Sequence, residues 1–433
     1  MSKLAILGGT PIRTAPFPAY QTIGEEEKRA VMKVLDSGVL SKFLGCWDAD
    51  FYGGTTVQAF EKAWAEFFGA RFAISVNSNT SGLFAAIGAA AVEPGDEVIV
   101  SPYSMSASAA CVLGYGGVPV FADIDERTFC LDPASVEACI TPRTKAIVVV
   151  DLFGHPFEAD TLMELARRHS LIVIEDAAQA PSAKYRGRFA GTLGHIGIFS
   201  LNYHKHIHTG EGGMITTDDP LLAERLQLLR NHGETVVEAM GSEQVHNMFG
   251  FNYRMTEMEA AVGIEQLRKL PALMKPWRSR AAELSERLAE YPGITPPFVQ
   301  EDCEHAYYVH ACKFDDTVVD VPRNRFIAAL RAELPVTALR ETDGPLVSSG
   351  YVKPLYLQPI YQRRAVACSF ACPKYQGAVS YDKGLCPVTE RMHEREFFCH
   401  EYMKPNMASA DVEDFLRAFD KVYTLRGELK NGQ

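Results

Sequence analysis

Short apolar segments alternate with helical patterns through the middle of the chain. They lie at residues 72–76, 98–100, 118–121, 146–150, 171–174, 196–201 and 214–216. Continuous apolar segments of this kind are typical of strands that are buried on both faces. Crossover helices between the first five segments predict a mostly parallel, seven-stranded sheet that is covered by helices.

Amphipathic patterns precede this region. Two helices are predicted there, at 22–37 and 56–68. The first has one face made of Ala30, Val31, Val34 and Leu35, and the second carries Val57, Phe60, Trp64 and Phe67 at helical spacing. Between the two helices, an aromatic and glycine-rich loop at 45–54 suits either the wall of a binding site or a contact with a partner subunit.

The alternation stops near residue 270. A long helix is predicted at 274–291, short strands around 305–314, and an amphipathic helix at 410–423 that Ser409 would cap. The inward face of this last helix would carry Val412, Phe415, Phe419 and Val422. The pattern therefore predicts an α/β fold with a larger domain at 1–270 and a smaller C-terminal α+β domain at 271–433.

Composition excludes several classes of function. A chain of 433 residues is too long for one small core, and 47% hydrophobic and 22% charged residues are ordinary for a globular protein. The net charge of -11, without a basic block, argues against nucleic-acid binding. The start lacks a signal-peptide pattern and no segment approaches the ~20 apolar residues of a membrane span, so we expect no membrane association and a cytoplasmic location.

Ten cysteines are scattered along the chain. The last four lie near His393 and His400, but no C-x-x-C pair occurs among them. Metal sites built on cysteine usually show that pairing, so we predict no metal.

Lys205 follows the sixth apolar segment and lies between His204 and His206. Lysine is usually solvated, so its position just after a buried strand has two interpretations. The side chain either extends along its flexible stem to water, or it is a partly desolvated amine whose lowered pKa suits Schiff-base formation.

Polar residues also follow two other predicted strands. After the first, the stretch NSNTSGLFAAIGAA at 77–90 opens a helix with small hydroxyl residues, either as a plain cap or as an anion site suited to phosphate. After the fifth, Glu175 and Asp176 place a carboxylate at the edge of the sheet, either as a helix-start acid or opposite a buried cation such as a protonated pyridine nitrogen. Gln179 lies three residues on, and Ser200 lies near the end of the sixth segment.

Ligands bind at the carboxyl ends of parallel strands, so these groups should meet at one edge. A phosphate cradle, an acid, a hydroxyl and an amine are the groups that hold pyridoxal 5′-phosphate (PLP). Their joint occurrence is much less expected by chance than any one of them alone. We therefore predict a PLP site.

The same stretches resemble the fold-type I PLP enzymes, and within them the DegT/StrS-type aminotransferases of nucleotide sugars and aminocyclitols. The matching stretches are EDAAQA, FSLNYHKHIHTGEGGM, LRNHGE at 229–234, NYRMTEMEAAVGIEQL at 252–267, LGGTPIR and FEKAWAEFFGA. The resemblance implies an aspartate-aminotransferase-like fold in which the N-terminal helices and the PLP-binding domain occupy 1–270.

The resemblance also implies roles for individual residues. Lys205 forms the Schiff base and moves the proton, and Asp176 keeps the pyridine nitrogen protonated, so both are catalytic. Gln179 approaches the phenolic oxygen of the ring. Glutamate or glutamine would donate the amino group, and a keto-sugar or keto-cyclitol, of the nucleotide-sugar or inosose type, would accept it.

Further residues are implied for the phosphate and for the acceptor. The phosphate is held by Thr80, Ser81 and Ser200, and by Asn252 of the partner subunit, which makes the active unit a homodimer with shared active sites. Candidates for the acceptor pocket are Tyr52 in the 45–54 loop, His206 and the partner subunit's Arg254. The stretch GYVKPLYLQPIYQ at 350–362 favours the cyclitol or antibiotic-pathway side of the family.

Two positions depart from the family pattern. Asn79 stands where the family usually has glycine before the phosphate threonine, and Met105 stands where an aromatic side chain usually stacks on the cofactor ring, so Tyr103 is an alternative stacking partner. Two other functions stay open. One is a PLP-dependent dehydratase, a branch that has histidine in place of the lysine and that Lys205 therefore disfavours, or an aminohydroxybenzoate-type synthase of the same family. The other is a non-catalytic partner protein that keeps the fold.

Overall fold

A seven-stranded sheet forms the centre of the computed structural model, which describes residues 3–337 and 345–430. Its order is β1-β9-β8-β5-β4-β2-β3, and every strand except β9 runs in the same direction. The bounds are β1 Phe72–Val76, β2 Glu97–Val100, β3 Val118–Phe121, β4 Thr144–Val150, β5 Ile172–Asp176, β8 Ile196–Ser200 and β9 Gly213–Thr217. The predicted mostly parallel sheet is confirmed, since each predicted segment became one of these strands.

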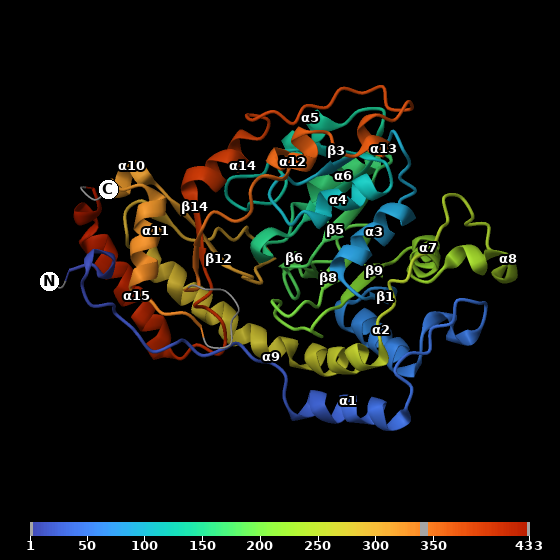
Figure 1. Ribbon diagram of the computed structural model, residues 1–433, viewed down its shortest axis with the longest axis horizontal. Helices are drawn as coiled ribbons and strands as arrows, with labels where there is room; N and C mark the ends of the chain where they lie inside the picture. The colour runs from blue at the N-terminus through green and yellow to red at the C-terminus, as the bar shows by residue number, and fades with distance from the viewer. Residues whose placement is uncertain (1–2, 338–344, 431–433) are drawn as a thin grey trace.

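Helices cover both faces of this sheet (Figure 1). Side chains alternate along a strand, so Val98 and Val100 pack in one core with α3 and α4, whereas Ile99 packs in the other with α6. α3 is apolar almost all round because the sheet and neighbouring helices enclose it. The bounds of the helices around the sheet are α2 Thr55–Phe68, α3 Asn79–Ala89, α4 Ala107–Gly114, α5 Pro133–Cys139, α6 Ala159–His169, α7 Pro220–Arg230 and α8 Val237–Met240.

A single long helix, α9 (Glu257–Leu288), joins the large sheet to the smaller C-terminal part (Figure 1). Thr256 caps it, and the Glu259 side chain returns a hydrogen bond to the Thr256 N–H group. The helix was predicted to begin at 274, but in the structure it begins at Glu257. Pro271 lies inside the helix, where proline usually weakens helical structure, but the tertiary packing of the buried face maintains it.

The smaller C-terminal part is built on a four-stranded sheet of order β10-β12-β14-β13. Its strands are β10 Ile294–Thr295, β12 His310–Phe314, β14 Phe397–His400 and β13 Val347–Ser349. Three further helices of this part are α10 Asp316–Val319, α11 Arg323–Ala332 and α15 Ser409–Thr424. The short strand β6 (Lys184–Tyr185) pairs on one side with β7 (Arg188–Phe189) and on the other with β11 (Cys303–Glu304), and so links the two parts.

The C-terminal chain also returns to the large sheet. The helices α12 (Pro359–Gln362), α13 (Ala367–Phe370) and α14 (Pro387–Arg391) belong to this returning segment, which Figure 1 draws in orange to red around β3 near the top of the view. Tyr356, Tyr361 and Tyr381 pack in the same core as α3 and α4, and the Tyr381 hydroxyl donates to the Pro119 carbonyl at 2.8 Å. The predicted boundary between the domains 1–270 and 271–433 falls within α9. The division into these two domains therefore stays a proposal.

Two local predictions differ from the structure. The first helix, α1, spans Glu25–Ser37, and of its predicted apolar face only Val34 is buried, while Leu35 is 46% exposed. The last helix, predicted at 410–423, begins one residue earlier, so Ser409 is its first residue and not its cap. The residue before it is Ala408, and its N–H group donates to the Asp411 carboxylate at 2.7 Å.

No helix in the described part of the chain is both long enough and apolar enough to cross a membrane.

Candidate active site

The carboxyl ends of the parallel strands open into a cavity of about 440 Å³. β5 ends at Asp176, β8 ends at Ser200, and Lys205 lies in the connection from β8 to β9. The chain leaving β1 leads to Ser78, which caps α3. The cavity is lined by Ser78, Asn79, Thr80, Ser104, Met105, Ala107, Val150, Asp176, Ala178, Gln179, Ser200, Asn202, His204, Lys205, Glu211, Tyr308 and Tyr351.

Lys205 is half-buried in this cavity and is the only lysine or arginine among the described residues that line it. Its Nζ atom lies 4.4 Å from the centroid of the Tyr308 ring. Burial lowers the pKa of Lys205 to about 8, and the charge of Asp176 partly opposes that shift. The neutral amine is therefore far more populated near neutral pH than in a solvated lysine, as Schiff-base chemistry requires.

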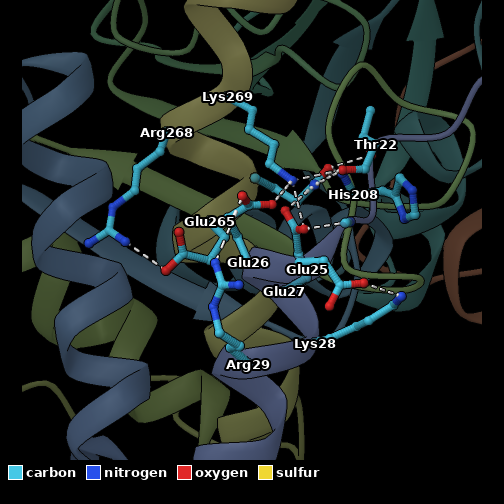
Figure 2. Close-up of polar contacts among 12 residues, drawn as sticks. Thr22, Glu25, Glu26, Glu27, Lys28, Arg29, His208, Glu265, Arg268 and Lys269 are labelled. Carbon is cyan, nitrogen blue, oxygen red and sulfur yellow. Dashed lines mark hydrogen bonds and ion pairs between the residues drawn. The ribbon is translucent and has the colours of Figure 1, made fainter.

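The loop that carries Lys205 is held from outside by α1 and α9. The side-chain oxygen of Gln266 accepts a hydrogen bond from the His208 N–H group at 3.3 Å, and the Gln266 amide donates to Glu27 at 2.7 Å. Figure 2 shows Lys269 of α9 reaching Glu27 of α1 beside His208, with 2.7 Å between nitrogen and oxygen. This buried network fixes a backbone atom close in sequence to Lys205.

His206 faces away from the cavity. It is fully buried, stacks on Trp277 with 4.3 Å between ring centroids, and donates from Nε2 to the Ala306 carbonyl at 2.9 Å. Burial lowers the pKa of His206 to about 3, so the ring is neutral. The Tyr20 hydroxyl donates to the His206 carbonyl at 2.6 Å. The structure therefore makes His206 part of the support of the loop and not of the cavity wall.

Asp176, and not Glu175, is the carboxylate that faces the cavity. Glu175 points to the other side, where it accepts hydrogen bonds from three backbone N–H groups, those of Gly191, Leu193 and Gly194. Asp176 is 4% exposed, and burial raises its pKa, while the Ala178 N–H group and the charge of Lys205 oppose that shift. The residue pattern left both carboxylates open and the family resemblance implied Asp176; the alternation of side chains along β5 turns Asp176, and not Glu175, toward the cavity.

The start of α3 forms a small polar cradle. The Ser78 hydroxyl accepts from the Ser81 N–H group at 3.0 Å, whereas the N–H groups of Asn79 and Thr80 have no acceptor in the described chain. Thr80 is exposed to the cavity. Ser81 is not, because its hydroxyl donates to the Asn77 side chain at 2.6 Å. Free N–H groups at a helix start suit an anion, so the cradle fits a phosphate through Thr80 and Ser200 better than through Ser81.

The Gly-Glu-Gly-Gly turn lets β9 start directly against this cradle. A Cβ atom on Gly213 would lie 2.7 Å from the Ser78 carbonyl carbon and 2.8 Å from the Asn79 nitrogen. Gly212 has a φ of +149°, which other residues rarely adopt. The two glycines are therefore required by the close approach of two backbones, which places the Lys205 loop beside the helix start.

Tyrosine, glutamine and methionine form another part of the wall. Gln179 accepts from the Phe153 N–H group at 2.7 Å and donates to the Tyr351 hydroxyl at 2.9 Å. Met105 is 55% exposed and lines the cavity. Tyr103 does not line it, because the side chain is fully buried and its hydroxyl accepts from the Tyr351 N–H group at 2.9 Å. Met105 therefore remains the candidate for the ring face.

Three other predicted residues lie outside this cavity. Tyr52 lines a separate open groove on the surface, and Asn252 is exposed. Arg254 is half-buried, and its Nε atom has no hydrogen-bond partner in the described chain. Within one subunit, none of the three lines the wall beside Lys205.

Several residues of the wall were not predicted from the sequence. These are Ser78, Ser104, Asn202, Glu211, Tyr308 and Tyr351, together with Ser108 behind Asp176. Asn202 and Glu211 flank Lys205 in the chain, so their position near a reactive lysine was a usable signal. Tyr308 and Tyr351 come from the C-terminal part, and no local pattern connects them with the strand ends.

One buried group resembles a metal site in composition. His310, Cys312 and His400 are fully or almost fully buried with potential ligand atoms within 4.8 Å of one another. The two imidazole rings are stacked, with centroids 4.5 Å apart and an angle of 28° between their planes. Ring lone pairs lie in the ring plane, so nearly parallel rings do not converge on one ion. We therefore keep the prediction that no metal is bound.

The sequence profile of the DegT/DnrJ/EryC1/StrS aminotransferase family matches residues 21–419. The chain belongs to this family. The predicted membership and the aminotransferase class of enzyme are thereby confirmed.

Among relatives of this DegT/DnrJ/EryC1/StrS aminotransferase, L-glutamine:2-deoxy-scyllo-inosose aminotransferase of Streptomyces fradiae is 37% identical over 432 residues, which cover 98% of each chain. GDP-perosamine synthase of Caulobacter vibrioides is 40% identical over 285 residues, which cover 65% of this chain and 76% of that one. The crystal structure of DesI in the presence of its TDP-sugar product has a TM-score of 0.80 and 27% identity, and covers 99% of this chain and 98% of that one. The aspartate-aminotransferase-like fold-type I class is confirmed by this likeness.

Proposed function

We propose that this aminotransferase binds PLP in the cavity at the ends of β1, β5 and β8, and moves an amino group from glutamine or glutamate to a keto-cyclitol or keto-sugar. The observation that carries the proposal is the meeting of three groups in one cavity. These are the free N–H groups at the start of α3, the Asp176 carboxylate and the Lys205 amine. They match the phosphate, the ring nitrogen and the aldehyde of PLP.

Each residue has a separate task in this proposal. PLP supplies an electron sink that stabilises negative charge next to the amino group of the substrate. The Lys205 amine, whose pKa is lowered by burial, takes and returns the proton at the reacting carbon, which contributes roughly 10²–10⁴-fold to the rate. Asp176 provides a fixed negative charge toward which a ring N–H group can point. Tyr308 covers the amine and limits its contact with water.

The acceptor is proposed to be a polyhydroxylated ketone that is not linked to a nucleotide. Inosose aminotransferase from Streptomyces fradiae matches nearly the whole chain, whereas GDP-perosamine synthase matches 65% of it. The wall near Lys205 carries Asn202 and Glu211, which can hydrogen-bond to hydroxyl groups. A diphosphate would favour cationic side chains, and Lys205 is the only one among the described residues of the wall.

A direct assay tests the activity. Purified protein reconstituted with PLP is expected to lose its visible absorbance when glutamine or glutamate is added, and to recover it when an inosose is added, with an amino-cyclitol detected by mass spectrometry. A set of nucleotide-linked keto-sugars serves as the comparison. Absorbance that persists with every amino donor contradicts the aminotransferase proposal; loss of water from the product without gain of nitrogen indicates the dehydratase alternative.

The active unit is proposed to be a homodimer. Helix α1 and the chain that flanks it expose seven large apolar side chains, namely Ile23, Met32, Leu35, Val39, Leu40, Leu44 and Trp47. Apolar patches of this kind usually mark a protein interface. Asn252 and Arg254 lie outside the cavity of their own subunit, as expected of residues that serve a partner's cavity. The cytoplasmic location and the absence of a nucleic-acid partner remain part of the same proposal.

Placing a charge in this patch is expected to separate the subunits. Leu35→Glu puts a carboxylate at a side chain that is 46% exposed in one subunit and buried in the proposed dimer. Light scattering should then report a monomer, and an activity assay should show low turnover. Leu221→Glu, at an exposed leucine on α7, is the matched control that should stay dimeric. A Leu35→Glu protein that remains a dimer contradicts this choice of interface.

A further inference from the structure

Asn79 connects the two ends of the proposed cofactor site. It is the first residue of α3, and its side-chain Nδ2 atom lies 3.1 Å from Oδ1 of Asp176 at the end of β5. Both residues line the cavity. One side chain therefore joins the helix start that suits a phosphate to the carboxylate that suits a ring nitrogen.

The two oxygens of Asp176 are not used equally. Oδ1 accepts from the Ala178 N–H group at 3.2 Å and from Asn79 at 3.1 Å, whereas Oδ2 accepts only from the Ser108 hydroxyl at 3.2 Å among the described donors. Each carboxylate oxygen has about two acceptor positions. Oδ1 is therefore filled, and Oδ2 keeps one position open.

We propose that Asn79 is a positioning residue for Asp176. Its amide fixes the rotation of the carboxylate and stabilises the ionised form, so that the open position on Oδ2 is presented to a protonated ring nitrogen. The inference rests on the proposed binding of PLP. It gives Asn79 a function that glycine could not perform, because glycine has no side-chain hydrogen-bond donor.

The electrostatic surroundings make this donor important. Burial raises the pKa of Asp176, and the titratable groups that interact with it are Lys205, Asp151, Cys111 and Tyr351. Of these four, only Lys205 is cationic, and its own pKa is lowered by burial. Hydrogen-bond donors therefore carry much of the task of keeping Asp176 ionised, and removing one moves its protonation to higher pH.

The test is the affinity of the apoprotein for PLP as a function of pH, measured by quenching of intrinsic fluorescence. Asn79→Ala is expected to bind PLP roughly tenfold more weakly near neutral pH, as for the loss of a hydrogen bond to a charged group. As the pH is lowered, the affinity of Asn79→Ala for PLP should begin to fall at a higher pH than that of the wild type, because the pKa of Asp176 is higher in the variant. Ser108→Ala, which removes the donor to Oδ2, should move the profile in the same direction.

Ser78→Ala is the matched control. Ser78 lies next to Asn79 at the same helix start but makes no hydrogen bond to Asp176 in the described structure. Its loss should weaken PLP binding by a similar factor at every pH. Asn79→Gly, which keeps the backbone and removes the amide, replaces Asn79→Ala if the latter does not fold.

The outcomes separate this inference from the proposed function. A wild-type protein that does not bind PLP overturns the proposed function. If the wild type binds PLP but the affinity of Asn79→Ala or Asn79→Gly for PLP falls at the same pH as that of the wild type, the inference alone is overturned. A shift in the Asn79 variants that is absent from Ser78→Ala supports it.

Discussion

Replacing Lys205 by alanine is expected to reduce the rate of amino transfer roughly 10²–10⁴-fold, the usual contribution of a positioned proton-transfer group. The physical reason is that no other lysine lines the cavity in the described chain, so nothing can take over the proton. Single-turnover mass spectrometry of the keto acid formed from glutamine measures the effect. The protein should keep its melting temperature, because Lys205 is only half-buried and stabilises no core.

Two controls make this result specific. Lys205→Arg keeps a cation of similar length but has no amine that can be neutral near pH 7, so it should be as inactive as the alanine variant. A small primary amine added to Lys205→Ala should restore part of the turnover. A Lys205→Ala protein with a tenth or more of the wild-type rate would remove Lys205 from the chemistry.

Replacing Asp176 by asparagine is expected to lower the rate roughly 10²–10³-fold, the size of effect seen when one preorganised electrostatic group is lost. The amide is nearly the same size and its oxygen can still accept from the Ala178 N–H group, so the fold should be retained. The negative charge of Asp176 raises the pKa of Lys205, so its loss should lower that pKa below about 8. Labelling of Lys205 by an amine reagent, followed against pH in the apoprotein, measures this second effect.

Glu175→Gln is the matched control for Asp176→Asn. Both changes remove a buried carboxylate from the end of β5, but Glu175 accepts from three N–H groups, and a glutamine amide would direct a donor at one of them. An unsatisfied buried donor costs about 1–3 kcal/mol. We expect Glu175→Gln to lower the melting temperature and leave the lysine pKa unchanged. The reverse pattern would mean that the two carboxylates have been assigned to the wrong sides.

Local patterns predicted the sheet well because each strand is a short apolar segment with helices on both faces. Burial on both faces leaves a continuous apolar segment in the sequence, whatever the rest of the chain does. The same argument predicted less about α9. Proline normally ends a helix, but α9 continues past Pro271 and Pro276 with Leu270, Met274 and Trp277 of its buried face packed in the core.

The candidate site was predicted in part. Lys205, Asp176, Gln179, Thr80, Ser200, Asn79 and Met105 all line one cavity. Ser81, His206 and Tyr103 were named as candidates through the family resemblance, but in the structure each is turned away by a partner that the sequence does not reveal. For Ser81 that partner is Asn77, for His206 it is Trp277, and for Tyr103 it is the backbone of Tyr351.

The sequence by itself determined which segments form the strands of the large sheet, the family, and the presence of a lysine and an acid at strand ends. These follow from local composition and from the rule that parallel strands end at one edge. The residue pattern alone did not separate Asp176 from Glu175, although the family resemblance implied Asp176. Only the tertiary structure decided that Tyr308 and Tyr351 complete the wall of the cavity and that Asn79 reaches Asp176. Side-chain direction and contacts between distant residues arise from packing, and packing depends on residues that lie far apart in the sequence.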